Sequence, residues 1–205
     1  REYAKLISTY IDGLAVHIKD DNKIHAMFNQ ALTQTGRLSS SEPNLQNISV
    51  RDEEGKLIRK AFYYQEEGYS ILSLDYSQIE LRILASLSHC QSLIDIFNSD
   101  EDIHSATARK VFHVDGEVSA LQRRKAKAVN FGIVYGISDW GLSEQLGISV
   151  YESKEIINSF YEAYPEIGQF LSNLVIEVTN KGYVTTVNGR RRYLREIYDT
   201  NYQVR

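Results

Sequence analysis

The sequence predicts an α+β protein that is mainly helical and has a partial antiparallel sheet. Three observations support this prediction. Apolar residues recur at helical spacing through most of the chain after its first third, a stretch near the beginning alternates as a strand does, and an Asn-Gly turn stands near the end. The length of 205 residues allows one large domain or two modest ones, each with a buried core.

The sequence of the first third of the chain predicts short helical and strand segments separated by loops. Residues 2–10 are typical of the end of a helix, and the alternating apolar residues of 24–29 predict a short strand. Residues 36–51 are rich in serine, asparagine and glycine, which predicts a loop. Residues 69–75 predict a buried strand that ends at Asp75.

Helices dominate the predictions for the following residues. The first should begin at Ser77, because Ser77 and Glu80 are three residues apart, as in a capping box. Apolar spacing predicts the next three helices over residues 91–98, 103–112 and 121–135.

The last quarter of the chain predicts two helices and a hairpin. One helix begins after Ser149 and stops at Pro165, and the next ends near Gly182. Residues 183–194 predict a hairpin with Asn188-Gly189 as a two-residue turn.

Composition predicts a protein outside the membrane. The hydrophobic fraction is 42% and the mean hydropathy is −0.35, and no apolar run approaches the roughly 20 residues that span a bilayer. A single cysteine, Cys90, excludes an internal disulfide and suits a reducing cytoplasm. No signal peptide is visible, and a first residue of Arg1 leads us to expect an excised or processed chain. We expect a monomer without membrane partners.

Positive charge is concentrated in two segments of an acidic chain. The net charge is −4, yet residues 118–138 and 181–195 together hold nine basic residues and no acidic one. Such segments can form a local phosphate-binding site, although two solvated basic surfaces would give the same pattern.

The helix predicted over 121–135 has a distinctive surface. Arg123, Lys127, Phe131 and Tyr135 are four residues apart and form one stripe, opposite the apolar residues of the same helix. Cations followed by aromatic rings suit a nucleoside triphosphate, and the amino-terminal end of a helix favours anions. An ordinary amphipathic surface helix is the alternative.

Asp75 is a candidate metal ligand. A carboxylate at the end of a strand can hold Mg²⁺, which takes one or two carboxylates together with phosphate oxygens and water. Asp75 can equally do no more than open a turn, just as Ser77 and Glu80 can do no more than cap the helix.

Four segments resemble those of the bacterial DNA polymerase I family, also called family A. DYSQIELR and RRKAKAVNFGIVYG, which begin at Asp75 and Arg123, are similar to its first and second polymerase motifs. TGRLSSSEPNLQNISVR, from Thr35, is similar to the segment before the first motif, and GRRRY, from Gly189, to its finger hairpin. The resemblance covers essentially the whole chain.

The resemblance implies a catalytic site and a nucleotide site. Asp75 and Lys127 would take part in catalysis, with Asp75 and the carbonyl of Tyr76 binding two Mg²⁺ ions in the intact enzyme. Glu80 would exclude a ribose 2′-hydroxyl. The residues implied for the incoming deoxynucleoside triphosphate are Gln78, Glu80, His104, Arg123, Lys127, Phe131 and Tyr135.

The resemblance also implies contacts with primer–template DNA and a division into subdomains. The implied DNA contacts, mostly to phosphates and the minor groove, are Arg37, Asn44, Asn47, Arg51 and Tyr135. The implied subdomains are the end of the thumb (1–20), a partial palm (21–86), helical fingers (87–198) and the start of a return to the palm (199–205).

The sequence departs from the family pattern at three places. Lys125 stands where many relatives would have a small residue, and Ser49 replaces an expected proline. The third motif, His-Asp-Glu, does not occur, and the segment Asp102-Ile103-His104 is a different, helical one. We expect the third motif beyond Arg205, so the second catalytic carboxylate is not identified.

These observations lead to one main function and two alternatives. The intact protein would be a template-directed DNA polymerase for replication or repair, and the chain by itself would be inactive. A non-catalytic module that binds nucleotide or DNA is one alternative for the chain. A single-subunit RNA polymerase is the other, and Glu80 argues against it. A P-loop nucleotidase is excluded, because no GxxxxGK[ST] sequence is present.

Overall fold

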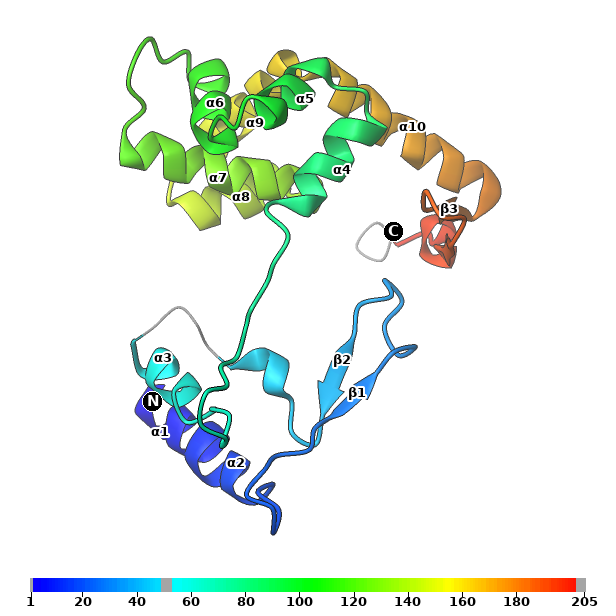
Figure 1. Ribbon diagram of the computed structural model, residues 1–205. Helices are drawn as coiled ribbons and strands as arrows, with labels where there is room; N and C mark the ends of the chain where they lie inside the picture. Colours follow the sequence, from blue (N-terminus) through cyan, green and yellow to red (C-terminus); the bar gives the residue numbers. More distant parts are fainter. Residues whose placement is uncertain (1, 49–52, 202–205) are drawn as a thin grey trace. The chain divides into compact units, whose positions relative to one another are not determined.

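A computed structural model describes residues 2–48 and 53–201, which form two compact units, Arg1–Leu74 and Asp75–Arg205 (Figure 1). The predicted class is confirmed, because helices make up most of the described chain and the strands form two small antiparallel pairs. No helix within these residues is long and apolar enough to span a membrane.

The first unit holds short elements. A helical segment runs through α1 (Glu2–Leu6), a π-type stretch at Ile7–Asp12 and α2 (Gly13–Ala15). The other elements are β1 (Met27–Asn29), β2 (Ser39–Ser41), a 3-10 turn (Leu45–Asn47) and α3 (Glu53–Arg59).

Two predictions for this unit need correction. The predicted strand over 24–29 is reduced to β1, and the predicted loop over 36–51 contains β2 and a 3-10 turn in its described part. β2 forms because its backbone pairs with β1, with Phe28 opposite Ser40. Strand pairing therefore overrides the weak strand preference of a Ser-Ser-Ser sequence.

The predicted buried strand over 69–75 is wrong. These residues form no strand, and Ile71, Leu72 and Leu74 are 68%, 79% and 84% exposed. A strand needs a neighbour for its N–H and C=O groups, and no strand of the described chain pairs with this segment. Apolar alternation alone does not supply that partner.

The second unit is a helical assembly followed by a hairpin (Figure 1). Its central helix, α7 (Ala120–Val134), packs against α4 (Ile79–Leu87), α6 (Ile103–Val111), α8 (Asp139–Leu146) and α9 (Val150–Ala163). The remaining elements are α5 (Gln91–Asn98), α10 (Pro165–Lys181), β3 (Tyr183–Thr185), β4 (Arg191–Tyr193) and a 3-10 turn (Arg195–Tyr198).

The core of this unit joins every helix from α4 to α10. Val129 of α7, Leu142 of α8, Phe160 of α9 and Ile167 of α10 are at most 1% exposed and belong to one apolar cluster. Full burial of side chains of this size stabilises the fold by about 1.5–3 kcal/mol each. This core fixes the helices on which most of the expected site residues stand.

Two local predictions for the second unit also need correction. α4 begins at Ile79, and Gln78, in the left-handed region (φ 53°), precedes it without any side-chain cap. The expected Ser77–Glu80 capping box is therefore absent, since capping requires an extended residue at that position. The hairpin turn is not the two-residue Asn188-Gly189 type. Gly189 N–H donates to Thr186 O and Thr186 N–H to Arg190 O, so the loop has three residues, and Gly189 (φ 80°) allows it.

Candidate functional site

The stripe predicted on α7 is confirmed. Arg123, Lys127 and Tyr135 are exposed and Phe131 is half-buried, whereas Ala126, Val129 and Ile133 of the opposite face are buried. The cations lie toward the amino-terminal end and the aromatic rings toward the carboxyl-terminal end of the helix.

A capping box that sequence analysis missed fixes the start of α7. Ser119 Oγ accepts from Gln122 N–H at 3.2 Å, and Gln122 Oε1 accepts from Ser119 N–H at 2.9 Å. Such a cap contributes about 1 kcal/mol. The signal was present as a serine followed three residues later by a glutamine. The cap thereby fixes the position of the Arg123 side chain at the first turn of α7.

The other end of α7 turns tightly enough to place Tyr135 beside α4. A Cβ at Gly132 would lie 2.7 Å from Ile137 Cγ2, so only glycine permits Ile137 to fold back there. Tyr135 Oη then donates a hydrogen bond to Glu80 Oε1 at 2.9 Å. Two expected site residues that are 55 positions apart are thus in direct contact.

Arg123 is bound by a carboxylate at the start of α6. Its Nε donates to Asp102 Oδ2 and its Nη2 to Asp102 Oδ1, both at 2.9 Å. Asp102 also caps α6, accepting from Ser105 N–H at 2.9 Å. The Arg123 guanidinium, and secondly Ser105, hold the pKa of this carboxyl well below its usual range. Sequence analysis did not assign Asp102 a role, although an aspartate before an apolar helix is a cap signal.

Lys127, the second cation of the stripe, has a different environment. No carboxylate of the described chain forms an ion pair with it. Lys125, which lies off the stripe, instead pairs with Glu152 at 3.1 Å. Lys127 is therefore the stripe cation that remains open to an anion.

His104 of α6 is 3% exposed and lies beneath the stripe. Its ring centroid is 5.7 Å from that of Phe131, and its Nδ1 is 3.1 Å from Asn130 Nδ2. The pKa of His104 is lowered mainly by burial. The nearby cations Arg123 and Lys127 lower this pKa further, whereas the Asp102 carboxylate raises it. Burial therefore favours the neutral form of the imidazole.

The expected metal ligands are less constrained. Asp75 and Tyr76 are exposed on an extended segment, and within residues 2–48 and 53–201 no three acidic, histidine or cysteine side chains cluster as a metal site would. Gln78 is half-buried, and its Oε1 is buried without a hydrogen-bond partner in the described chain. One carboxylate and one carbonyl leave most of the coordination of Mg²⁺ to phosphate and water.

Three of the expected DNA contacts lie in the first unit, whereas Tyr135 lies at the end of α7 in the second. Arg37, Asn44 and Asn47 are exposed in the first unit, and Arg51 lies outside the described residues. Asn44 Oδ1 caps the 3-10 turn by accepting from Gln46 N–H at 3.0 Å. Asn47 O accepts from Tyr10 Oη at 2.9 Å, which holds the end of this turn against the helical segment.

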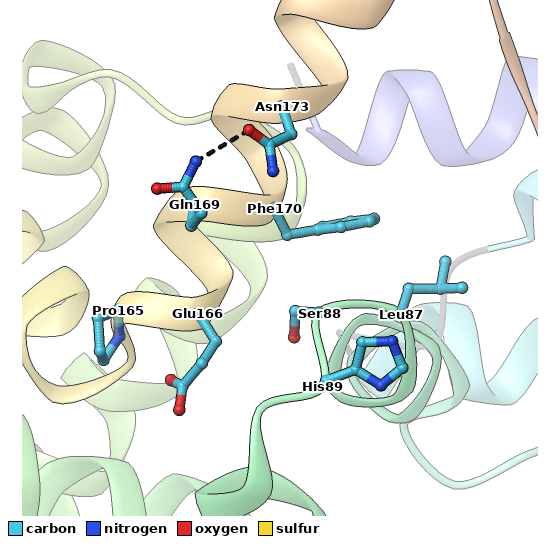
Figure 2. Close-up of a pocket in the computed structure, with 8 residues that line it drawn as sticks. All are labelled: Leu87, Ser88, His89, Pro165, Glu166, Gln169, Phe170 and Asn173. Carbon is cyan, nitrogen blue, oxygen red and sulfur yellow. Dashed lines mark hydrogen bonds between the residues drawn. The ribbon is translucent and has the colours of Figure 1, made fainter.

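The expected nucleotide site does not coincide with either of two pockets found in the described chain. A pocket of about 530 Å³ lies between the end of α4 and the start of α10. Figure 2 shows the residues that line it, among them His89, Glu166 and Phe170. A larger pocket, of about 1020 Å³, lies within the first unit. No expected site residue lines either one. The candidate site is an exposed helix face supported by a buried polar cluster.

Comparison with known proteins decides the family. The sequence model that describes the family "DNA polymerase family A" matches residues 1–205 of this chain. The chain belongs to DNA polymerase family A. The resemblance inferred from the motifs is thereby confirmed.

Family A relatives match this chain over its whole length. DNA polymerase I of Bacillus caldotenax and that of Bacillus subtilis are each 52% identical, and that of Geobacillus stearothermophilus is 53% identical, over 207 residues. Each match covers 100% of this chain and 24% of the relative, so the chain spans about a quarter of their length.

A solved structure is similar as well. It is the POL domain of Pol1 from M. smegmatis, in complex with DNA primer-template and dNTP. The match has a TM-score of 0.90 and 44% identity, and covers 100% of this chain and 36% of that one.

Proposed function

We propose that the intact protein is a template-directed DNA polymerase and that this chain carries its nucleotide-selecting part. The observation that carries the proposal is the α7 stripe, where cations at the amino-terminal end are followed by aromatic rings. Membership of family A supports it, as does the likeness to a polymerase domain bound to primer-template and dNTP.

Lys127 and Arg123 would hold the triphosphate, and Phe131 and Tyr135 the nucleoside. Lys127 lacks a carboxylate partner in the described chain, so it would form charge-assisted hydrogen bonds to the phosphates without first breaking an ion pair. Arg123 would exchange the Asp102 carboxylate for a phosphate, and His104 would contact the same phosphates. In the reaction, a primer 3′-hydroxyl attacks the α-phosphate and pyrophosphate leaves.

Glu80 would select deoxyribose. The hydrogen bond from Tyr135 holds its carboxylate at the carboxyl-terminal end of α7, beside the position proposed for the sugar. A carboxylate fixed there leaves no room for a 2′-hydroxyl. This argues against the RNA polymerase alternative.

Asp75 and the carbonyl of Tyr76 would hold Mg²⁺ together with the triphosphate and water. The metal would neutralise charge on the phosphates and activate the primer hydroxyl, and we expect two ions in the intact enzyme. A further carboxylate must come from outside the motifs of this chain, because His-Asp-Glu is absent from its sequence.

Arg37, Asn44, Asn47 and Arg51 would contact primer–template DNA, and Tyr135 would lie by the template base. The thumb end, partial palm and fingers would correspond to residues 1–20, 21–86 and 87–198, with 199–205 returning to the palm. We expect the intact protein to act as a monomer in the bacterial cytoplasm. For the chain by itself, binding without catalysis is the alternative, favoured by the missing third motif.

Lys127→Ala in the intact protein tests the proposal. It should remove a contact worth about 1.5–3 kcal/mol, so nucleotide affinity or single-turnover incorporation should fall ten-fold or more. Lys125→Ala is the matched control, because Lys125 is on the same helix but pairs with Glu152. Equal rates and affinities for the two variants would refute the assigned role of α7.

A further inference from the structure

A chain of four buried polar side chains runs through the second unit to the α7 stripe. Tyr164, Thr107, Asn130 and His104 are each at most 3% exposed. Tyr164 Oη is 3.4 Å from Thr107 Oγ1, which is 3.2 Å from Asn130 Oδ1. Asn130 Nδ2 is 3.1 Å from His104 Nδ1 and 3.1 Å from Thr107 Oγ1. The cluster connects the α9–α10 junction, α6 and α7.

The donor of each hydrogen bond follows from the available protons. Burial raises the pKa of Tyr164 to about 12, so its hydroxyl keeps a proton that must be donated. Thr107 Oγ1 is the only side-chain acceptor recorded for it in the described chain, so Tyr164 donates to Thr107. Thr107 then donates to the amide oxygen of Asn130.

The amide nitrogen of Asn130 donates one hydrogen bond to Thr107 Oγ1 and lies 3.1 Å from Nδ1 of His104. An amide NH₂ can only donate, so Nδ1 of His104 accepts and carries no proton. In a neutral imidazole the proton must then be on Nε2. The charged groups that face this ring are Asp102 from α6 and Arg123 and Lys127 from α7.

We propose that Asn130 is a positioning residue that fixes His104 as the Nε2–H tautomer, so that His104 donates a hydrogen bond to the phosphate held by Lys127 and Arg123. The identity of that ligand rests on the proposed function, whereas the tautomer does not. A neutral donor adds a directed hydrogen bond beside two cations without bringing a third positive charge among them.

Nitrogen-15 spectra of the histidine-labelled 205-residue chain test the tautomer directly, because protonated and unprotonated ring nitrogens differ strongly in chemical shift. The signals of His104 are those lost in His104→Gln. At about pH 7, the wild-type chain should show a protonated Nε2 and an unprotonated Nδ1. An Nδ1–H tautomer or an imidazolium in the wild-type chain would overturn the proposal.

Asn130→Asp tests the role of the amide. A carboxylate can only accept, so it should move the proton to Nδ1 and raise the pKa of His104. Asn173→Asp is the matched control, because Asn173 is exposed on α10 and, among the described residues, its side-chain amide bonds with Gln169 alone. A His104 signal that is the same in both variants would overturn the proposal. If Asn130→Asp does not fold, Thr107→Val serves instead, since it frees the amide to rotate and should give a mixture of tautomers.

Titration with dTTP and Mg²⁺ tests the contact with phosphate. In the wild-type chain, the chemical shift of the His104 Nε2–H signal should change when dTTP is added. In the intact polymerase, Asn130→Asp should bind nucleotide about ten-fold more weakly at pH values above the raised pKa of His104. The nucleotide affinity of this variant should therefore depend on pH in a way that the wild-type affinity does not. Retention of the Nε2–H tautomer without any response to dTTP would overturn the phosphate contact and the proposed nucleotide site, but not the role of Asn130 in setting the tautomer.

Discussion

The Asp102 carboxylate accepts two parallel hydrogen bonds from the Arg123 guanidinium, one to each of its oxygens and both at 2.9 Å. The pair joins the first turn of α7 to the start of α6. Arg123 is also one of the two cations proposed to hold the triphosphate. Asp102 is therefore an internal competitor of the nucleotide.

Removing this competitor should strengthen nucleotide binding. Asp102→Asn removes the charge but keeps the helix cap, because asparagine caps as well as aspartate does. In the intact protein, triphosphate affinity should rise roughly two- to five-fold, measured as a nucleotide dissociation constant. Glu101→Gln, which removes the neighbouring carboxylate that pairs with Arg109, is the control. A weaker affinity in Asp102→Asn would mean that Asp102 orients Arg123 for the phosphate and does not compete with it.

The same pair makes stability depend on pH in acid. Arg123 lowers the folded-state pKa of Asp102 below its ordinary value of 3.8. The ionised carboxylate therefore stabilises the fold above that value, and this contribution is lost as the pH falls toward the folded-state pKa. The gap in unfolding free energy between wild type and Asp102→Asn should narrow below about pH 4, measured by urea denaturation. If the difference in unfolding free energy between the two proteins stayed constant below about pH 4, the lowered pKa assigned to Asp102 would be contradicted.

Sugar selection should depend on Glu80 and on its hydrogen bond from Tyr135. Shortening Glu80 to Gly in the intact protein should raise ribonucleotide incorporation relative to deoxyribonucleotide, because it vacates the position proposed for the 2′-hydroxyl. Tyr135→Phe removes only the donated hydrogen bond and should raise the ratio less. Primer-extension rates with paired nucleotides measure both effects. If Glu80→Gly left the ratio unchanged, Glu80 would have no part in sugar selection.

Phe131 should determine the response to dideoxynucleotides. Its half-buried ring contacts His104 and carries no hydroxyl. We expect the intact protein to discriminate against dideoxynucleotides, which lack the 3′-hydroxyl that interacts with the triphosphate. Phe131→Tyr supplies a substitute hydroxyl and should weaken this discrimination about ten-fold, equivalent to roughly 1.4 kcal/mol. Competition between the two nucleotides in primer extension checks this, and equal selectivity in the two proteins would refute it.

The 205-residue chain by itself should bind nucleotide but not extend a primer. Its stripe is formed, so we expect Mg²⁺-assisted binding of deoxynucleoside triphosphates in the millimolar range, about −4 kcal/mol. DNA affinity should be weak and strongly dependent on salt. Trp140, which is 64% exposed on α8, provides a fluorescence signal for the titration. Primer extension that Asp75→Ala abolishes would contradict the catalytic half of this prediction.

The sequence by itself determined the family, most helices of the second unit and the stripe, but not α3 or α8. Helical boundaries such as Ser149, Pro165 and Gly182 depend on local backbone chemistry, which a short sequence contains. The stripe of α7 depends only on helical periodicity, so Arg123 and Lys127 could be placed on one exposed face without a structure. The long motifs then gave the family and, through it, the expected site.

Only the tertiary structure decided what the site residues contact. Asp102 and Arg123 are 21 positions apart, Glu80 and Tyr135 are 55 apart, and no periodicity links them. The strand predicted over 69–75 failed for the same reason, because a strand depends on a partner elsewhere in the chain. From the sequence alone, Asn130 was assigned no role. Packing of α6, α7 and the α9–α10 junction made it a hydrogen-bond donor to His104, because a buried amide must satisfy its polar atoms with whatever the fold places beside it.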